Sequence, residues 1–219
     1  MSLEQKIIEN YGNRINKDEI YNSIYSKLAV LEKTKKIEKI VSTFIEITPN
    51  TSILEIGAGQ GGNIPLLLKL GFKESNIYLN EILPERISAL KRNYPNIKIF
   101  EGNAININYN RTFDIVFQST VFTSILNEKD RINLATKIWN ILNPHGVVLW
   151  YDFIYNNPKN KNVKKVAVKE VIKLFSEAYS YKILKVTLAP PIGRRVGKLY
   201  NLFNFPFLRS HILAVFHKK

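Results

Sequence analysis

The stretch SILEIGAGQGGN, from Ser52 to Asn63, decides the fold that we expect for this chain. It opens with the apolar run ILEI at 53–56, which predicts a short buried strand. The glycines at 57, 59, 61 and 62 then predict a sharp turn, because glycine adopts backbone conformations that other residues avoid. The apolar run IPLLLKL follows at 64–70, and its early proline suits the first turn of a helix. Strand, glycine turn and helix in this order indicate the first half of a βαβ unit.

Two carboxylates indicate which ligand such a turn would hold. Glu55 lies inside the first predicted strand, and Glu81 ends the next one, about twenty residues beyond the turn, where an acid can accept hydrogen bonds from ribose hydroxyls. The glycines alone also fit the dinucleotide pattern GxGxxG. Glu55 decides between the two ligands, since it would repel a pyrophosphate but attract the ammonium group of S-adenosylmethionine. The sequence therefore predicts an S-adenosylmethionine site.

The pattern Glu55-x-Gly57-x-Gly59-x-Gly61 resembles the first motif of the class I S-adenosylmethionine-dependent methyltransferases. The resemblance extends over most of the chain from about residue 21. Four further runs look like a bacterial subfamily of this class that is often associated with surface-glycan or secondary-metabolite pathways: QSTVFTSIL (118–126), LWYDFIYNNPKN (149–160), TLAPPIGRRV (187–196) and LFNFPFLRSHILAV (202–215). The resemblance implies an α/β, Rossmann-like fold with a seven-stranded, mostly parallel sheet, an antiparallel last strand and helices on both faces.

The resemblance also implies a set of cofactor contacts. Glu55 and the glycine turn would hold the methionine end, Glu81 the ribose, and Asn103 with Ala104 the adenine. Members of the class usually carry an acid where Asn103 stands, but an asparagine can still hydrogen-bond adenine because it has both a donor and an acceptor. The expected cofactor-binding residues are Glu55, Gly57, Ala58, Gly59, Gly61, Asn63, Glu81, Ile82, Asn103, Ala104, Gln118 and Ser119. S-adenosylhomocysteine is the expected product of the cofactor.

Asp152 is the candidate catalytic residue. It ends a predicted buried strand, on the same sheet edge as Glu55 and Glu81, and a buried carboxylate is costly unless it is paired or functional. It could act as a general base or orient the acceptor, and capping the loop that follows explains it equally well.

Tyr151, Arg194 and Arg195 are the expected substrate-binding residues. The two arginines follow a Pro-Pro pair that we expect to form a rigid turn, and they could clamp a phosphate or a carboxylate of the acceptor. The aromatic-rich insertion near 190–208 is interpreted as a lid or a pocket wall, and equally as core.

Composition excludes some kinds of site. The chain has no cysteine, so it has no disulfide, thiolate metal site or cysteine nucleophile. Its three histidines lie far apart and show no metal-ligand spacing, so we expect no metal. The formal net charge of +14 fits a nucleic-acid binder, a membrane-surface binder or an enzyme for anionic substrates. The lysines are scattered among many isoleucines and asparagines, however, which favours a general compositional bias.

The 219 residues predict one domain, with residues 1–49 as an N-terminal helical segment on the core and 50–219 as the catalytic domain. The lysines of a predicted helix at 31–47 are interpreted as its solvated face. No apolar run is long enough to span a membrane, and the first thirty residues are polar rather than signal-like, so we expect a cytoplasmic protein. Oligomeric state is left open.

We expect methyl transfer to a small molecule, at a hydroxyl of a sugar or other metabolite that could be anionic. An RNA methyltransferase remains an alternative, although residues 118–121 read QSTV instead of the Asn/Asp-Pro-Pro-aromatic tetrad of base-modifying enzymes. A methyltransferase-like protein that binds the cofactor without catalysis is another. A nicotinamide oxidoreductase is disfavoured by Glu55, and its Tyr-x-x-x-Lys spacing, at 94/98, 155/159 and 181/185, never falls in a suitable helix.

Overall fold

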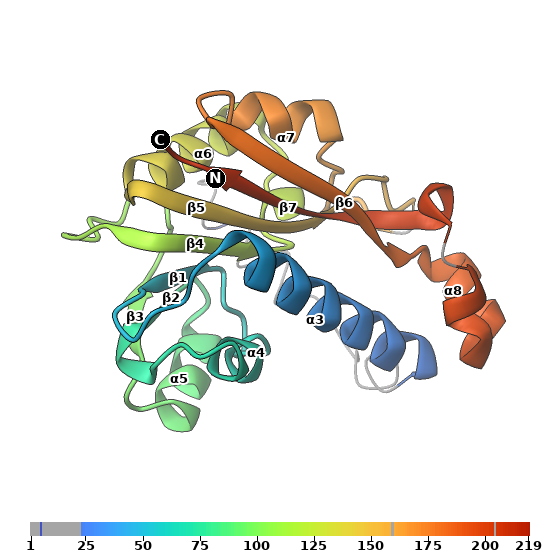
Figure 1. Cartoon of the computed structure of the whole chain (residues 1–219), viewed down its shortest axis with the longest axis horizontal. Coiled ribbons are helices and arrows are strands. Elements are labelled where there is room, and N and C mark those ends of the chain that lie inside the picture. Colours follow the sequence, from blue (N-terminus) through green and yellow to red (C-terminus); the bar gives the residue numbers. More distant parts are fainter. Residues whose placement is uncertain (1–4, 6–22, 159, 204) are drawn as a thin grey trace.

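A seven-stranded sheet forms the centre of the molecule (Figure 1). The computed structural model describes residues 5, 23–158, 160–203 and 205–219. Neighbouring strands β1 to β5 are parallel, and the last strand, β7, is antiparallel to both of its neighbours. The predicted Rossmann-like architecture is therefore confirmed. The strand order is β3 (Lys98–Glu101), β2 (Ile77–Glu81), β1 (Ile53–Ile56), β4 (Phe113–Ser119), β5 (Leu142–Phe153), β7 (Arg209–His217) and β6 (Ser180–Leu188).

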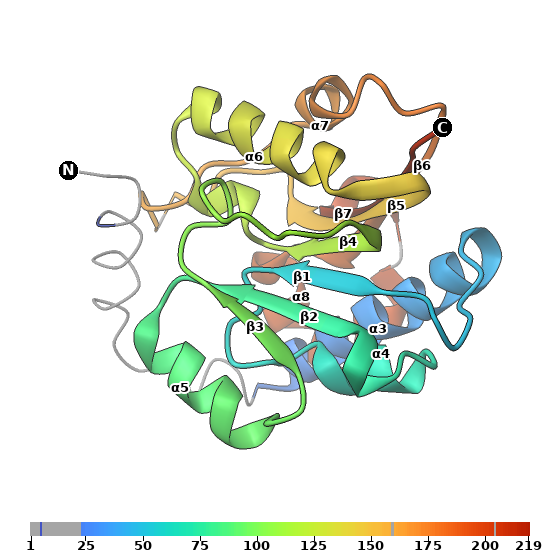
Figure 2. The same cartoon turned by 90° about the vertical axis from the view of Figure 1, so that its left-hand side faces the viewer.

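Helices cover both faces of the sheet (Figure 2). One face, which we call the α3 face, is covered by α3 (Ile24–Phe44), α4 (Ile64–Lys69) and α5 (Pro84–Asn93). The opposite α6 face is covered by α6 (Glu128–Asn140) and α7 (Val168–Leu174). Because strand side chains alternate between faces, Ile53 of β1 packs on the α3 face, whereas Leu54 and Ile56 pack on the α6 face. Short helices complete the chain: η1 (Glu74–Asn76), η2 (Phe122–Ser124), α8 (Pro190–Val196), η3 (Gly197–Phe203) and η4 (Pro206–Leu208).

The first long helix begins earlier than the sequence pattern predicts. Ser23 caps α3 by accepting a hydrogen bond from the Ser26 N–H at 3.2 Å, so the helix starts at Ile24 and not near residue 31. Residues 1–22, the start of the predicted N-terminal helical segment at 1–49, lie outside the described residues except for Gln5. Among the helices of the described chain, none has both the length and the apolar character that crossing a bilayer requires.

The apolar spacing of residues 163–178 predicts an amphipathic helix over that range, but both of its predicted ends are wrong. Only Val168–Leu174 is α-helical, because the segment before it uses its backbone donors elsewhere. The Lys164 N–H donates to the Thr123 carbonyl at 2.8 Å, which ties this segment to the loop that follows β4. Tertiary pairing has thus replaced the first turns of the expected helix.

The Pro-Pro turn predicted before Arg194 is also wrong, because residues 190–196 form helix α8. Proline suits the first turn of a helix, where its missing N–H needs no partner. The ring of Tyr25 lies so close over Gly193 that an added Cβ would come within 2.3 Å of it.

The sequence predicts a fifth strand at 147–151 after a turn at 143–146, but the strand of the structure is longer and starts at Leu142. His145 lies inside it with a φ of 62°, and the register of β4 against β5 shifts between Phe113 and Ile115. This irregularity accommodates the turn that the sequence indicates at 143–146.

Candidate functional site

The glycine turn connects β1 to α4 at the carboxyl edge of the sheet. Gly57 and Gly59 have φ values of +66° and +62°, which side chains rarely tolerate. A Cβ on Gly57 would lie 2.6 Å from Cγ2 of Val121, so the turn packs directly against the loop after β4. At Gly59 the nearest atom to such a Cβ, on Arg86, is 3.9 Å away, which leaves the backbone open to a ligand.

Glu55 supplies the least satisfied polar group of this region. It lies on the α3 face of β1, where its Oε1 accepts a hydrogen bond from Nδ2 of Asn63 at 2.6 Å. Its Oε2 is buried and has no hydrogen-bond partner among the described residues. Burial raises the pKa of Glu55 to about 7, even though Asn63 and the nearby Lys33 oppose the shift. A ligand ammonium placed at Oε2 would complete these contacts, so the site fits the methionine end of S-adenosylmethionine.

Glu81 lies on the same face, against the opposite side of the glycine turn. Its Oε2 accepts from the Gly59 N–H at 2.7 Å, and its Oε1 accepts from the N–H groups of Ile82 and Leu83 at 2.9 and 3.0 Å. A carboxylate offers about four acceptor positions, so Glu81 can still accept from a ribose hydroxyl. Both acids that the sequence singled out are thus brought to one turn.

The other predicted cofactor residues make contacts of their own, away from the two acids. Oδ1 of Asn103 accepts a hydrogen bond within its own loop, from the Ile105 N–H at 3.1 Å, and the neighbouring Ala104 is buried. Gln118 is buried and holds the loop after β4, because its Oε1 accepts from the Val121 N–H at 3.1 Å. Ile82 and Ser119 are partly exposed.

Lys33 is a residue that the sequence analysis missed. Its Nζ donates to Oδ1 of Asn63 at 2.7 Å and lies 5.2 Å from the ring centroid of Tyr151. Burial lowers its pKa, and the charge of Glu55 acts in the opposite direction. The prediction that the lysines of this helix are a solvated face is therefore wrong for Lys33. The signal was available in the spacing, since Lys33 precedes the buried Ile37 and Ile40 by four and seven residues on one helical stripe.

Tyr151, an expected substrate-binding residue, lies on the α3 face beside Lys33. Its hydroxyl shares a hydrogen bond with Oγ1 of Thr187 at 2.8 Å, and the ring of His211 stacks on it at 5.0 Å between centroids. Thr187 has a φ of 61°, a strained conformation for a β-branched residue that is typical of functional sites. Burial and the charge of Lys33 lower the pKa of His211 to about 3, so its imidazole is neutral at neutral pH.

Asp152 lies on the α6 face, because it is adjacent in β5 to Tyr151 on the α3 face. Its Oδ1 accepts from Oγ1 of Thr123 at 2.7 Å and from the Phe153 N–H at 2.9 Å, and its Oδ2 accepts from the Thr123 N–H at 3.2 Å. Burial raises its pKa to about 7, with the hydrogen bonds and Arg131 opposing the shift. These contacts match the capping role, and the catalytic role stays a prediction.

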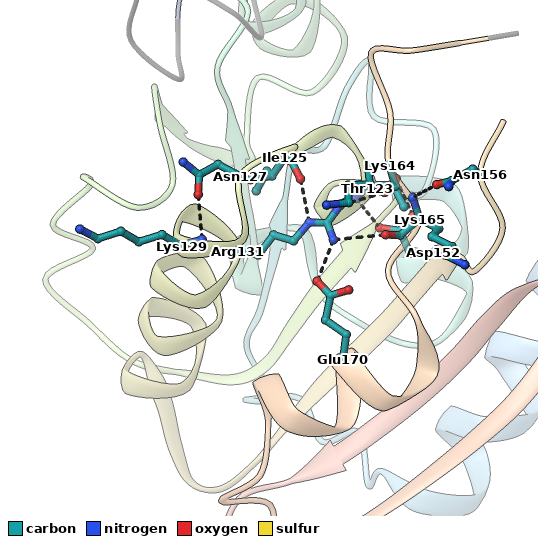
Figure 3. A network of polar contacts seen from close by, with 10 residues as sticks. All are labelled: Thr123, Ile125, Asn127, Lys129, Arg131, Asp152, Asn156, Lys164, Lys165 and Glu170. Atoms are coloured by element: carbon teal, nitrogen blue, oxygen red, sulfur yellow. Dashed lines mark hydrogen bonds and ion pairs between the residues drawn. The ribbon is translucent and has the colours of Figure 1, made fainter. Parts of the chain in front are cut away.

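Arg131 anchors the surroundings of Asp152 (Figure 3). Its guanidinium is buried and donates to the carbonyls of Ile125, Lys164 and Lys165 and to the carboxylate of Glu170, at distances between 2.7 and 3.2 Å. This network fixes the loop after β4 and the segment before α7 in one position.

Arg194 and Arg195 are exposed on α8, which projects beyond the end of the sheet beside α3 (Figure 1). Within the insertion at 190–208, Tyr200 is buried and its hydroxyl bonds Glu32 of α3 at 2.5 Å, whereas Leu202 and Phe207 are exposed. The structure thus brings Tyr151 next to Lys33, which bonds Asn63 at the end of the glycine turn. The roles of the two arginines and of the insertion stay predictions.

Known proteins share both the motif and the fold. Residues 53–146 match the family model described as a methyltransferase domain. The chain is 28% identical over 123 residues to the glycine/sarcosine/dimethylglycine N-methyltransferase of Actinopolyspora halophila, a match that covers 54% of this chain but only 21% of that relative.

Solved structures resemble the whole chain at low identity. The N-methyltransferase NodS of Bradyrhizobium japonicum, in complex with S-adenosylhomocysteine, has a TM-score of 0.67 and 11% identity, with 100% of this chain and 99% of that chain covered. A putative sarcosine dimethylglycine methyltransferase of Galdieria sulphuraria has a TM-score of 0.64 and 13% identity, covering 99% and 98%. The chain thus has the fold of the class I S-adenosylmethionine-dependent methyltransferases, and residues 53–146 match the model of a methyltransferase domain. The predicted class of enzyme and its cofactor are confirmed.

Proposed function

We propose that this protein transfers a methyl group from S-adenosylmethionine to a small-molecule acceptor. The observation that carries the proposal is the buried Oε2 of Glu55, which has no partner among the described residues and lies beside the open glycine turn. The bound cofactor supplies a methyl group that its sulfonium has already activated. Glu55 would hold the ammonium of that cofactor, Glu81 its ribose, and Asn103 with Ala104 its adenine.

The chain's own contribution to the reaction is placement. Methyl transfer is an in-line displacement, so the rate depends on holding the acceptor atom close to the methyl carbon in a fixed direction. Tyr151, Thr187 and His211 form a polar cluster on the same face as Glu55, at the carboxyl edge of the sheet. We propose this cluster as the acceptor side of the site, with Arg194 and Arg195 as outer contacts for an anionic acceptor.

The acceptor atom is a hydroxyl oxygen in the first form of the proposal, on a sugar or another metabolite. A hydroxyl must lose its proton during transfer, and the low pKa of His211 makes that imidazole a weak base. A neutral amine attacks with its lone pair and needs no base in the same step. The weak basicity of His211 therefore favours an amine as the second candidate acceptor, and relatives that are named as N-methyltransferases agree with it.

A screen with radiolabelled S-adenosylmethionine tests the proposal. The purified chain is incubated with separate pools of sugar nucleotides, amino acids and small amines, and RNA, and mass spectrometry locates the methyl group in any labelled product. Label on a small molecule is the expected result, and the labelled atom decides between oxygen and nitrogen. Label in RNA would contradict the small-molecule acceptor, and cofactor binding without any labelled product would favour the non-catalytic alternative. A labelled sugar nucleotide would support the association with surface-glycan pathways.

A further inference from the structure

We propose that Lys33, together with Asn63, forms a carboxylate-binding site on the α3 face, between the glycine turn and Tyr151. The proposal rests on the proposed function and deepens it, because it assigns the ligand chemistry of one position in that site. The carboxylate could belong to the methionine end of the cofactor or to the acceptor. Both sources present the same group to Lys33, and the experiment below separates them.

The Lys33 ammonium has an incomplete set of contacts among the described residues. An ammonium has three N–H donors, and Asn63 is the hydrogen-bond partner of Lys33 among the described residues, at 2.7 Å. No acidic side chain of the described residues forms an ion pair with Lys33. Withdrawing this ammonium from water is costly, and the charge of Glu55, which forms no ion pair with it, offsets that cost only in part, so a further anion would be stabilised here.

Asn63 bridges two opposite charges, the ammonium of Lys33 and the carboxylate of Glu55. Its Oδ1 accepts from Lys33, and its Nδ2 donates to Glu55 at 2.6 Å. One amide therefore holds a cation on one side and a carboxylate on the other. This arrangement complements an amino acid, whose ammonium would meet Glu55 and whose carboxylate would meet Lys33.

Lys33 also lies near the ring of Tyr151. Its Nζ lies 5.2 Å from the centroid of the Tyr151 ring, and the ring of His211 stacks on Tyr151 with 5.0 Å between the centroids. An acceptor bound against these rings would also place a carboxylate within reach of Lys33. The cofactor and the acceptor are the two sources that border this position.

Lys33 is not needed to dock α3 onto the sheet. The neighbouring Glu32 pairs with Arg209 of β7 at 2.8 Å, and the hydroxyl of Tyr25 donates to the Leu188 carbonyl at 2.8 Å. Ile37 and Ile40 are buried in the core of the same face. Because these contacts already hold the helix, a purely structural role does not account for a half-buried ammonium at this position.

Calorimetry on the whole chain tests the site with two variants and a matched control. Lys33→Met removes the charge but keeps an unbranched side chain, Lys33→Arg keeps the charge, and Lys39→Met removes an exposed charge from the same helix. The ligands are S-adenosylhomocysteine and its decarboxylated analogue. In a second titration, acetate is added to protein saturated with S-adenosylhomocysteine. Thermal melting of each variant checks that it is folded.

If the carboxylate is that of the cofactor, Lys33→Met binds S-adenosylhomocysteine about 10- to 100-fold more weakly and binds the decarboxylated analogue as the wild type does. If it belongs to the acceptor, Lys33→Met keeps its affinity for S-adenosylhomocysteine but no longer binds acetate. In either case Lys33→Arg retains part of the lost affinity and Lys39→Met behaves like the wild type.

Wild-type affinity of Lys33→Met in both titrations would overturn the carboxylate site and leave the proposed function intact. Failure of the wild-type chain itself to bind S-adenosylhomocysteine would instead overturn the proposed function. Should Lys33→Met fail to fold, the wild-type protein still decides. Equal affinity for S-adenosylhomocysteine and its decarboxylated analogue, with no acetate binding, would overturn the site.

Discussion

Glu55 and Asp152 are both buried carboxyls of central strands, yet their surroundings differ in one decisive respect. Each is 1% exposed, and burial raises the pKa of each to about 7. Asp152 lies on the α6 face, where both of its oxygens accept hydrogen bonds. Glu55 lies on the α3 face, where one oxygen accepts from Asn63 and the other has no partner among the described residues.

The difference teaches that a raised pKa alone does not identify a binding site. A buried polar group that is fully hydrogen-bonded stabilises the fold, whereas an incomplete one costs free energy until a ligand completes it. By this criterion the contacts of Asp152 match a structural role, and those of Glu55 match a site for a cation. Five predictions test this contrast.

Arg131→Met should have the largest effect, a loss of about 3–5 kcal/mol in the free energy of unfolding. The variant leaves the carbonyls of Ile125, Lys164 and Lys165 and the carboxylate of Glu170 without their donor. Urea denaturation measures the loss, and Lys129→Met, an exposed change on the same helix, is the control. A loss below about 1 kcal/mol would show that the network contributes little.

Glu55→Gln should weaken binding of S-adenosylhomocysteine by about 2–3 kcal/mol, because a charge-assisted contact to its ammonium is lost. The free energy of unfolding should stay the same or rise, since the amide oxygen still accepts from Asn63 and the buried ionisable group is gone. Calorimetry and urea denaturation measure the two quantities. Unchanged affinity would remove Glu55 from the cofactor site.

Asp152→Asn should show the opposite pattern, with a loss of about 1–3 kcal/mol in stability and unchanged affinity for S-adenosylhomocysteine. An asparagine turns one acceptor into a donor that faces the donors of Thr123 or Phe153. Thr123→Val removes the hydroxyl from the other side of the contact and should be similarly destabilising. Once an acceptor is known, loss of turnover in folded Asp152→Asn with intact cofactor affinity would support the catalytic role.

Stability should also depend on pH, because burial raises the pKa of both carboxyls. The folded-state pKa of Glu55 and Asp152, about 7, lies above the ordinary values of 4.5 and 3.8, so the folded chain holds more protons than the unfolded chain between these limits. The free energy of unfolding should therefore fall as pH rises from about 4 to 7 and level off above that. Urea midpoints at a series of pH values measure this slope, which Glu55→Gln should reduce.

Binding should couple to the same ionisation. A ligand ammonium stabilises the charged form of Glu55, so S-adenosylhomocysteine should release a fraction of a proton near neutral pH. Calorimetry in two buffers of different ionisation enthalpy detects the release, and Glu55→Gln should abolish it. Proton uptake in the wild type would contradict the assignment of the ammonium to Glu55.

The elements that the sequence predicted well are those with a strong local pattern. Strand β1, the glycine turn and strand β2 lie where expected, because a short apolar run bounded by glycines has few other conformations. The predicted helices at 31–47 and 163–178 had weaker boundaries. A serine cap extended the first, and pairing with the loop at Thr123 shortened the second.

By itself, the sequence determined the strand, glycine turn and helix, the positions of Glu55 and Glu81, and the class of cofactor. These depend on contacts between residues close in the chain and on the period of two within a strand, both of which are written in local order. Only the tertiary structure decided that Lys33 meets Asn63 and that Asp152 and Glu55 lie on opposite faces. The reason is physical: which face a strand residue occupies, and which helix covers it, depends on the packing of segments far apart in the sequence.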